Sequence, residues 1–160
     1  MAICLPETDS CYFCEIIEGR SDRWNVLAED DQVIVMLNVR QYEVGQSIVL
    51  PRRHAPTIFD LSRDELGAIM GAAKHASGVM RDVFDPDGIL IYQNNGVGSG
   101  QEVPHFHLHV VPRQAGSDWG FGPPHMERFE NPEKREKIDF TIHSKDKKAT
   151  AELMRSNWSI

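Results

Sequence analysis

The chain has 160 residues, 41% of them hydrophobic and 26% charged, which is typical of a globular protein with one packed core. Its formal net charge of -7 argues against broad binding to nucleic acid or to an acidic membrane surface, because both need a basic surface. It has no apolar run of the roughly 20 residues that span a bilayer, no signal-peptide pattern and an odd number of cysteines, so we expect a cytoplasmic protein without membrane contact or a disulfide framework.

A Cys-x-x-Cys pair, Cys11 and Cys14, opens the first patterned segment. Its apolar spacing and the following Gly19 predict one or two helical turns. The pair can be half of a zinc site, a redox pair or two buried cysteines. A redox pair normally lies in a βαβ unit, and that pattern is missing from this part of the sequence.

Strand patterns follow, and they predict a hairpin over 26–38 and another strand over 46–51. The strand over 46–51 is followed directly by a basic segment: Arg52, Arg53 and His54. A helix is predicted over 61–84, because Ser62 and Glu65 form a capping box and apolar residues then recur at helical spacing.

The segment 89–93 reads as another strand, and it enters a glycine-rich loop over 94–101. Such a loop lets the backbone approach a ligand closely. The tail beyond Arg113 is rich in glycine and proline to about residue 132, and a final helix is predicted over 149–158. Trp119 and Trp158 suggest that this tail reaches across a dimer to a neighbouring site.

The most informative stretch runs from Pro104 to Pro112 and alternates three histidines with apolar residues. Strand geometry would place all three imidazoles on one face and the apolar residues in the core. Two chemistries remain open at this point: a metal-binding strand, or a histidine nucleophile with helpers. The three histidines are His105, His107 and His109.

These residues resemble the histidine triad (HIT) family of nucleotide hydrolases and transferases. The stretch 105–111 matches the pattern His-φ-His-φ-His-φ-φ, where φ is apolar, and the landmarks at Cys11, Asn38, His54 and the Gly100–Pro104 lead-in occur in family order. The resemblance covers residues 11–113. It implies an α+β HIT-like fold, with an antiparallel sheet of about five strands, one long helix and a short N-terminal helix. It also implies a homodimer, with a HIT domain over 1–115 and a C-terminal extension over 116–160 packed on it.

The resemblance also implies roles for individual residues. His107 would be the nucleophile, with its other ring nitrogen held by a backbone carbonyl, and His109 would donate a hydrogen bond to phosphate oxygens. Gln101 and Asn94 would contact the phosphate or leaving group, and Asn38 would bind the ribose. Apolar residues near Asn38 would wall the base, among them Ile34, Met36 and Leu37.

In family members that carry the cysteine pair, the first histidine of the triad, here His105, is a metal ligand and has no catalytic role. The implied ligands of a closed, structural zinc site are Cys11, Cys14, His54 and His105. Two positions depart from the usual family pattern: Glu102 replaces a Ser or Thr, and Gln46 replaces a histidine that supports the nucleophile. A carboxylate at 102 would repel phosphate, or donate a proton if its pKa were raised.

Three functions are therefore weighed. The first is a HIT-type hydrolase or transferase acting on dinucleoside polyphosphates, nucleoside phosphoramidates or adenylylated small molecules. The second uses the three histidines as ligands of a catalytic metal, as in metal-dependent hydrolases. The third is a nucleotide-binding or partner-binding module with little turnover.

Overall fold

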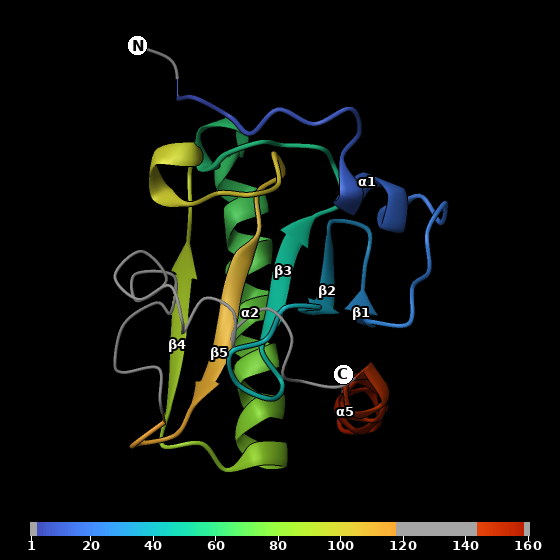
Figure 1. Ribbon diagram of the computed structural model, residues 1–160, viewed down its shortest axis with the longest axis vertical. Coiled ribbons are helices and arrows are strands. Elements are labelled where there is room, and N and C mark those ends of the chain that lie inside the picture. The colour runs from blue at the N-terminus through green and yellow to red at the C-terminus, as the bar shows by residue number, and fades with distance from the viewer. Residues whose placement is uncertain (1–2, 118–143, 159–160) are drawn as a thin grey trace.

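A computed structural model describes residues 3–117 and 144–158 of the chain. Its centre is a five-stranded antiparallel sheet with the strand order β1-β2-β3-β5-β4 (Figure 1). The strands are β1 (Val26–Glu29), β2 (Val33–Leu37), β3 (Ser47–Pro51), β4 (Gly88–Gln93) and β5 (Leu108–Arg113). The described helices are α1 (Tyr12–Ile17), α2 (Arg63–Phe84) and α5 (Ser144–Ser156), with short 3-10 turns η1 (Ile58–Asp60) and η2 (Val97–Ser99). The predicted α+β architecture is confirmed.

The two faces of the sheet carry separate hydrophobic clusters, because strand residues alternate between the faces. From β2, Val33, Val35 and Leu37 join the cluster with α2, whereas Ile34 and Met36 join the cluster with α1. The expectation that Ile34, Met36 and Leu37 wall a base is therefore wrong. All three have 0% exposed surface and lie in the core.

The long helix α2 begins at the predicted capping box. The Ser62 hydroxyl accepts a hydrogen bond from the Glu65 backbone N–H, and the Glu65 carboxylate accepts one from the Ser62 backbone N–H. Arg53, in the turn after β3, donates to the same carboxylate at 2.9 Å. This contact ties the start of α2 to the end of β3. None of the described helices is long and apolar enough to cross a membrane.

The histidine stretch differs from the predicted strand. β5 begins only at Leu108 and continues through Pro112 to Arg113, so His105 and His107 precede it. A tight turn in which the His105 N–H bonds the Val103 carbonyl at 2.8 Å bends the chain after Pro104. The alternation of side chains nevertheless holds, because Phe106, Leu108 and Val110 enter the α2 cluster. The three histidines therefore lie on the α1 face of the sheet.

The C-terminal helix α5 packs beside β1 and α2, where Ala151 and Met154 are fully buried (Figure 1). It starts five residues before the predicted helix. Arg155 donates to the backbone carbonyls of Trp24 and Val26, and the Trp158 ring lies 5.0 Å from His75 of the same chain. Trp158 thus packs on its own chain, and Trp119 lies outside the described residues.

Candidate functional site

A cavity of about 390 Å³ opens on the α1 face of the sheet, at the ends of β2, β4 and β5. Its volume is in the range of small-molecule binding sites. Four predicted site residues line it: Asn38, Asn94, His107 and His109. The other lining residues are Tyr12, Phe13, Val39, Arg40, Tyr42, Ile48, Tyr92, Gly100, Glu102 and Val103.

His107 is a buried part of the cavity lining, with 9% of its surface exposed. Its Nδ1 donates to the His105 backbone carbonyl at 2.7 Å, so the neutral ring keeps its proton on Nδ1 and a lone pair on Nε2. Burial lowers the pKa of His107, although this carbonyl and the Glu102 charge act in the opposite direction. The ring is therefore neutral near pH 7, as an attacking imidazole must be.

His109, on β5, lies beside His107 with ring centroids 4.9 Å apart. Its own ring stacks on Tyr92 at 4.4 Å and an interplanar angle of 11°. The Gln46 amide nitrogen lies 3.4 Å from His109 Nδ1, and because an amide nitrogen only donates, Nδ1 accepts. This arrangement leaves the His109 proton on Nε2. Gln46, one of the two departures from the family pattern, thus orients His109.

Gln101 does not line the cavity, in contrast to the other predicted substrate contacts. Its side chain is 3% exposed and accepts from the Gly96 N–H at 2.6 Å. Its amide nitrogen donates to the carbonyls of Pro56 and Val103 at 2.7 and 2.9 Å. Gln101 therefore holds the glycine-rich loop in place, and this geometry favours a positioning role.

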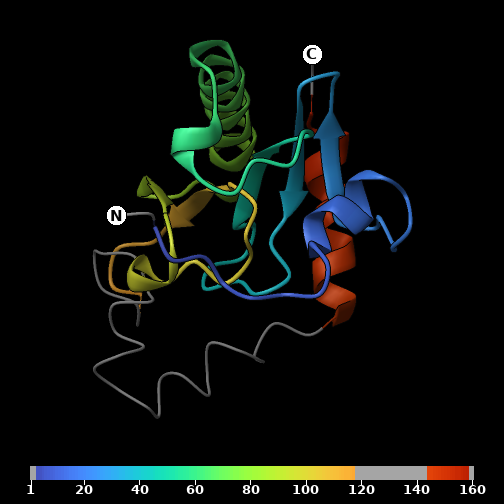
Figure 2. The same cartoon turned by 90° about the horizontal axis from the view of Figure 1, so that it is seen from above.

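The N-terminal segment also braces this loop. Cys4 accepts a backbone hydrogen bond from Val97 at 2.9 Å, and the segment runs alongside η2 in both ribbon views (Figures 1 and 2). At Gly96, where φ is +82°, a Cβ would lie 2.8 Å from the Cys4 carbonyl oxygen. Only glycine suits this position. The first residues, which look unstructured in the sequence, therefore shape the glycine-rich loop.

Sequence reasoning missed most of the cavity wall. Tyr12 and Phe13 come from α1, and Tyr42 comes from the loop between β2 and β3. Arg40 forms an ion pair with Glu102 at 2.7 Å. The aromatic residues of the Cys-x-x-Cys segment and the arginine two positions after Asn38 were visible signals, but nothing local indicates that they meet.

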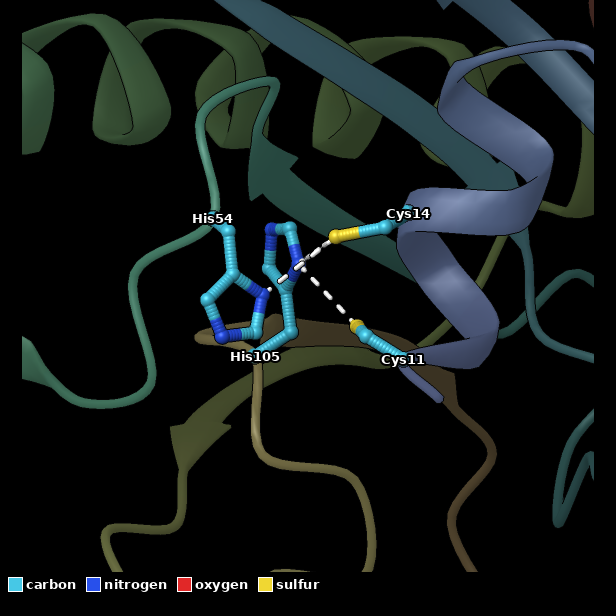
Figure 3. A group of neighbouring side chains, drawn as sticks. All are labelled: Cys11, Cys14, His54 and His105. Carbon is cyan, nitrogen blue, oxygen red and sulfur yellow. Dashed lines mark hydrogen bonds between the residues drawn. The ribbon is translucent and has the colours of Figure 1, made fainter. Parts of the chain in front are cut away.

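A second group of chemical residues lies next to the cavity. The Sγ atoms of Cys11 and Cys14 and ring nitrogens of His54 and His105 all lie within 4.8 Å of one another. The two cysteines come from the start of α1, His54 from the turn after β3, and His105 from the segment before β5 (Figure 3). The structure thus brings together the four predicted metal ligands.

The spacing of these atoms fits a tetrahedral metal. Bonds of about 2.3 Å to sulfur and about 2.0 Å to nitrogen would separate the two donor atoms by about 3.5 Å. His105 Nδ1 lies 3.5 Å from the Cys11 Sγ and 3.6 Å from the Cys14 Sγ, and His54 Nδ1 lies 3.3 Å from the Cys14 Sγ. The residues present therefore fit a zinc-sized cation.

The surroundings of His105 hold its ring in the state that a metal ligand needs. Its Nε2 donates to the Pro51 carbonyl at 2.9 Å, which leaves the Nδ1 lone pair directed at the cysteines. Burial lowers the pKa of His105 to about 4, so the ring is neutral. Burial also raises the pKa of Cys14 to about 11, and the neighbouring Cys11 adds to this shift. Binding a cation here would release thiol protons.

This arrangement separates the three histidines into two sites. Among the described residues, one group has the spacing of a metal centre, and it contains His105 but neither His107 nor His109. That division disfavours the hypothesis of a single three-histidine catalytic metal.

Comparison with known proteins places these features in a family. Residues 21–116 match the family model of the HIT domain. "Protein hit" of Bacillus subtilis is 32% identical over 114 residues, which cover 71% of this chain and 77% of that protein. A structure described as a Zn-bound histidine triad family protein, from Mycobacterium smegmatis, superposes with a TM-score of 0.73 at 24% identity, over 93% of each chain.

Two other relatives have names that state an activity. Adenylylsulfatase HINT3 of Arabidopsis thaliana is 29% identical over 106 residues, which are 66% of this chain and 53% of that protein. A bis(5'-adenosyl)-triphosphatase of Dictyostelium discoideum is 32% identical over 79 residues, 49% of this chain and 53% of that protein. The matched regions span about half the length of these two enzymes.

Proposed function

The chain belongs to the HIT domain family, and from that premise we propose that it is a nucleotide hydrolase or transferase acting at the α-phosphate of a nucleoside 5′-phosphate derivative. The observation that carries this proposal is the state of His107. Burial lowers the pKa of its ring, its Nδ1 donates to the His105 carbonyl at 2.7 Å, and it lines a ligand-sized cavity. These are the properties of an imidazole nucleophile.

The proposed reaction has two steps. In the first, His107 Nε2 forms a bond to the α-phosphorus, and the bond from phosphorus to the leaving group breaks, so that the leaving group departs with its electron pair. An amine leaving group also takes up a proton from solvent and departs as the neutral amine. In the second, water attacks the phosphorus and the electron pair of the P–N bond returns to His107. The products are the nucleoside monophosphate and a proton. Dividing the displacement in this way lowers each barrier.

The neighbouring side chains support this chemistry. We assign to His109 a hydrogen bond from Nε2–H to a phosphate oxygen, because Gln46 holds its Nδ1 as an acceptor. Asn38 is assigned to the ribose and Asn94 to the phosphate side, and both line the cavity. Gln101 positions Gly96 and Val103 through its buried amide. The aromatic rings of Tyr12 and Phe13 are apolar surfaces on which a base can lie.

Dinucleoside polyphosphates, nucleoside phosphoramidates and adenylylated small molecules remain the proposed substrate classes. The names of the Arabidopsis and Dictyostelium relatives support an adenosine nucleotide. In each class the reacting phosphorus is the one attached to the nucleoside, so one mechanism serves all three.

We further propose that Cys11, Cys14, His54 and His105 bind zinc as a structural ion. The donor-atom spacing supports this assignment, and two thiols with two imidazoles are a common zinc ligand set. With four protein ligands, no coordination position is left for substrate. The ion's role would be to hold α1, and with it Tyr12 and Phe13, against the segment that carries His107.

The homodimer, the cytoplasmic location and the division into a HIT domain (1–115) and an extension (116–160) remain proposals. β4 favours the dimer, because in the described part of the chain it is an edge strand paired only with β5, and its Ile91 is 40% exposed. The free edge of such a strand has unpaired backbone N–H and C=O groups, which can pair with a strand of a second copy. The buried Ala151 and Met154 of α5 favour an extension packed on the domain.

The test is to incubate the purified protein with diadenosine tetraphosphate or adenosine 5′-phosphoramidate, quench in base and measure the intact mass. We expect an added adenylyl group that is absent from His107→Ala. Turnover that survives His107→Ala and disappears with a chelator would support a metal hydrolase instead. Absence of both adduct and turnover would support a binding module.

A further inference from the structure

The cavity contains one ion pair that the proposed chemistry does not use. Arg40 and Glu102 both line the cavity, and Arg40 Nη1 lies 2.7 Å from Glu102 Oε2. Arg40 follows Asn38, the proposed ribose contact, whereas Glu102 lies on the lead-in to the histidines. The pair therefore joins the nucleoside side of the cavity to its phosphate side, across 62 residues of sequence.

The pair is a solvent-exposed part of the cavity lining. The side chains of Arg40 and Glu102 are 57% and 51% exposed, while His107 is 9% exposed. In a displacement at phosphorus the leaving group lies opposite the attacking nitrogen. A leaving group attached to a phosphorus at His107 would therefore extend away from the buried His107, towards the exposed lining that holds the ion pair.

An exposed ion pair of this kind adds little to stability, so it is easily rearranged. Arg40 has five N–H donors in a planar fork that suits phosphate oxygens, and Glu102 engages only part of them. A polyphosphate leaving group would compete with Glu102 for the guanidinium. A neutral leaving group such as ammonia has nothing to gain from it.

We propose that Arg40 and Glu102 are specificity-determining residues that select the leaving group by its charge. Arg40 binds the phosphate next to the α-phosphate of an anionic leaving group. Glu102 opposes this binding, both by repelling the phosphate and by occupying the guanidinium. This inference rests on the proposed function and deepens it, because it predicts which substrate class each residue favours.

The test compares kcat/KM for diadenosine tetraphosphate, whose leaving group is a nucleoside triphosphate, with kcat/KM for adenosine 5′-phosphoramidate, whose leaving group is ammonia. For Glu102→Gln we expect the value for the tetraphosphate to rise about five-fold and the value for the phosphoramidate to change less than about two-fold. For Arg40→Gln we expect the tetraphosphate value to fall about ten-fold, with the phosphoramidate again little changed. Both effects should shrink at high salt, which screens exposed charges.

Asp82→Asn is the matched control. Asp82 forms an exposed ion pair with Arg81 at 2.8 Å on α2 and does not line the cavity. This variant changes the net charge by the same amount as Glu102→Gln, and we expect the ratio of the two kcat/KM values to stay at the wild-type value. If Asp82→Asn moves the ratio as much, overall charge is the cause and the inference is overturned.

The outcomes separate the inference from the proposed function. If the wild-type protein turns over neither substrate, the proposed function fails. If it turns over both and the ratio is unchanged in Arg40→Gln and Glu102→Gln, the function stands and the inference fails. Proportional losses on both substrates in the two variants would also overturn it, because they would reveal a general positioning role.

Discussion

Gln101 is a single side chain that organises backbone from three parts of the chain. Both of its amide protons and its carbonyl oxygen are bonded, to Pro56, Val103 and Gly96. An apolar replacement would leave the Gly96 N–H and the Pro56 carbonyl without a partner. The Val103 carbonyl would keep only its bond from the His105 N–H. The residue before Glu102 therefore shapes the cavity without lining it.

We expect Gln101→Leu to lower the free energy of unfolding by about 2 kcal/mol, because buried polar groups without partners are costly. The value of kcat/KM should fall as well, since the loop carrying Asn94 and Gly100 loses its support. Urea unfolding and steady-state kinetics measure the two effects. Gln114→Leu is the control, because Gln114 is exposed and should show neither loss. If Gln101→Leu unfolded at the same urea midpoint as the wild type, Gln101 would not support the loop as argued.

At the scale of elements, the Glu65 carboxylate at the start of α2 makes two contacts, one within the helix start and one with the turn after β3. Glu65 accepts from the Ser62 backbone and from Arg53 of the turn after β3. The Arg53 hydrogen bonds, followed by the contacts with Ser62, lower the pKa of Glu65 to about 2 from 4.5. A carboxyl whose pKa is lower in the folded state stabilises the fold while it is ionised.

We expect Glu65→Ala to reduce the free energy of unfolding by about 1 kcal/mol at pH 7, the usual contribution of a cap. The difference in unfolding free energy between the two proteins should have its full value above pH 4.5. It should diminish as the pH falls towards 2, where the wild-type carboxyl is itself protonated. Urea unfolding of both proteins across this range measures it. A difference that stays constant down to pH 2 would mean that packing, not the carboxylate, is responsible.

The elements were largely predictable, because their signals are local. The capping box at Ser62 and Glu65 marks the start of α2, and the continuous apolar run of β2 reflects its burial on both faces. The histidine alternation correctly indicated one face, but it placed the start of the strand too early. The turn between Val103 and His105, and the bond from Phe106 N–H to the Ala55 carbonyl, replace a regular ladder there.

At the scale of the whole molecule, the four-residue metal group links three distant segments. It connects α1 to the turn after β3 and to the segment before β5 (Figure 3). Because α1 supplies Tyr12 and Phe13 to the cavity, the proposed zinc would couple stability of the fold to the shape of the nucleoside site.

We expect removal of zinc with a chelator to lower the thermal midpoint by on the order of 10 °C, since metal binding adds to folding free energy. Metal analysis should find one zinc per chain in the wild type and in Cys4→Ser, whose cysteine is exposed and outside the group. Cys14→Ser should bind none and show the lower midpoint without a chelator. Equal metal content in the two variants would contradict the assignment.

The cavity wall was less predictable than the fold, because it depends on contacts between distant residues. The family resemblance identified four of the lining residues: Asn38, Asn94, His107 and His109. The Arg40–Glu102 pair spans 62 residues, and the contact between Lys147 and Val39 spans 108. Periodicity and capping describe neighbours along the chain, so neither contact has a local signal.

The Lys147 contact joins α5 to the cavity wall. Lys147 Nζ donates to the Val39 carbonyl at 2.6 Å, and Val39 lines the cavity between Asn38 and Arg40. This lysine lies beyond residues 21–116, which match the HIT family model, so the extension adds a support that the matched region lacks. We expect Lys147 to be a positioning residue, because its contact is with the Val39 backbone.

We expect Lys147→Met to raise KM for the nucleotide substrate about five-fold, with little change in kcat, because the displaced loop weakens binding more than the step at His107. Lys148→Met is the matched control, since it removes the same charge from the adjacent, exposed position and should leave KM unchanged. Unfolding measurements on both variants show whether α5 stays packed. A KM that rises equally in the two variants would reveal a general charge effect, whereas a fall in kcat alone would mean that α5 acts on the chemical step.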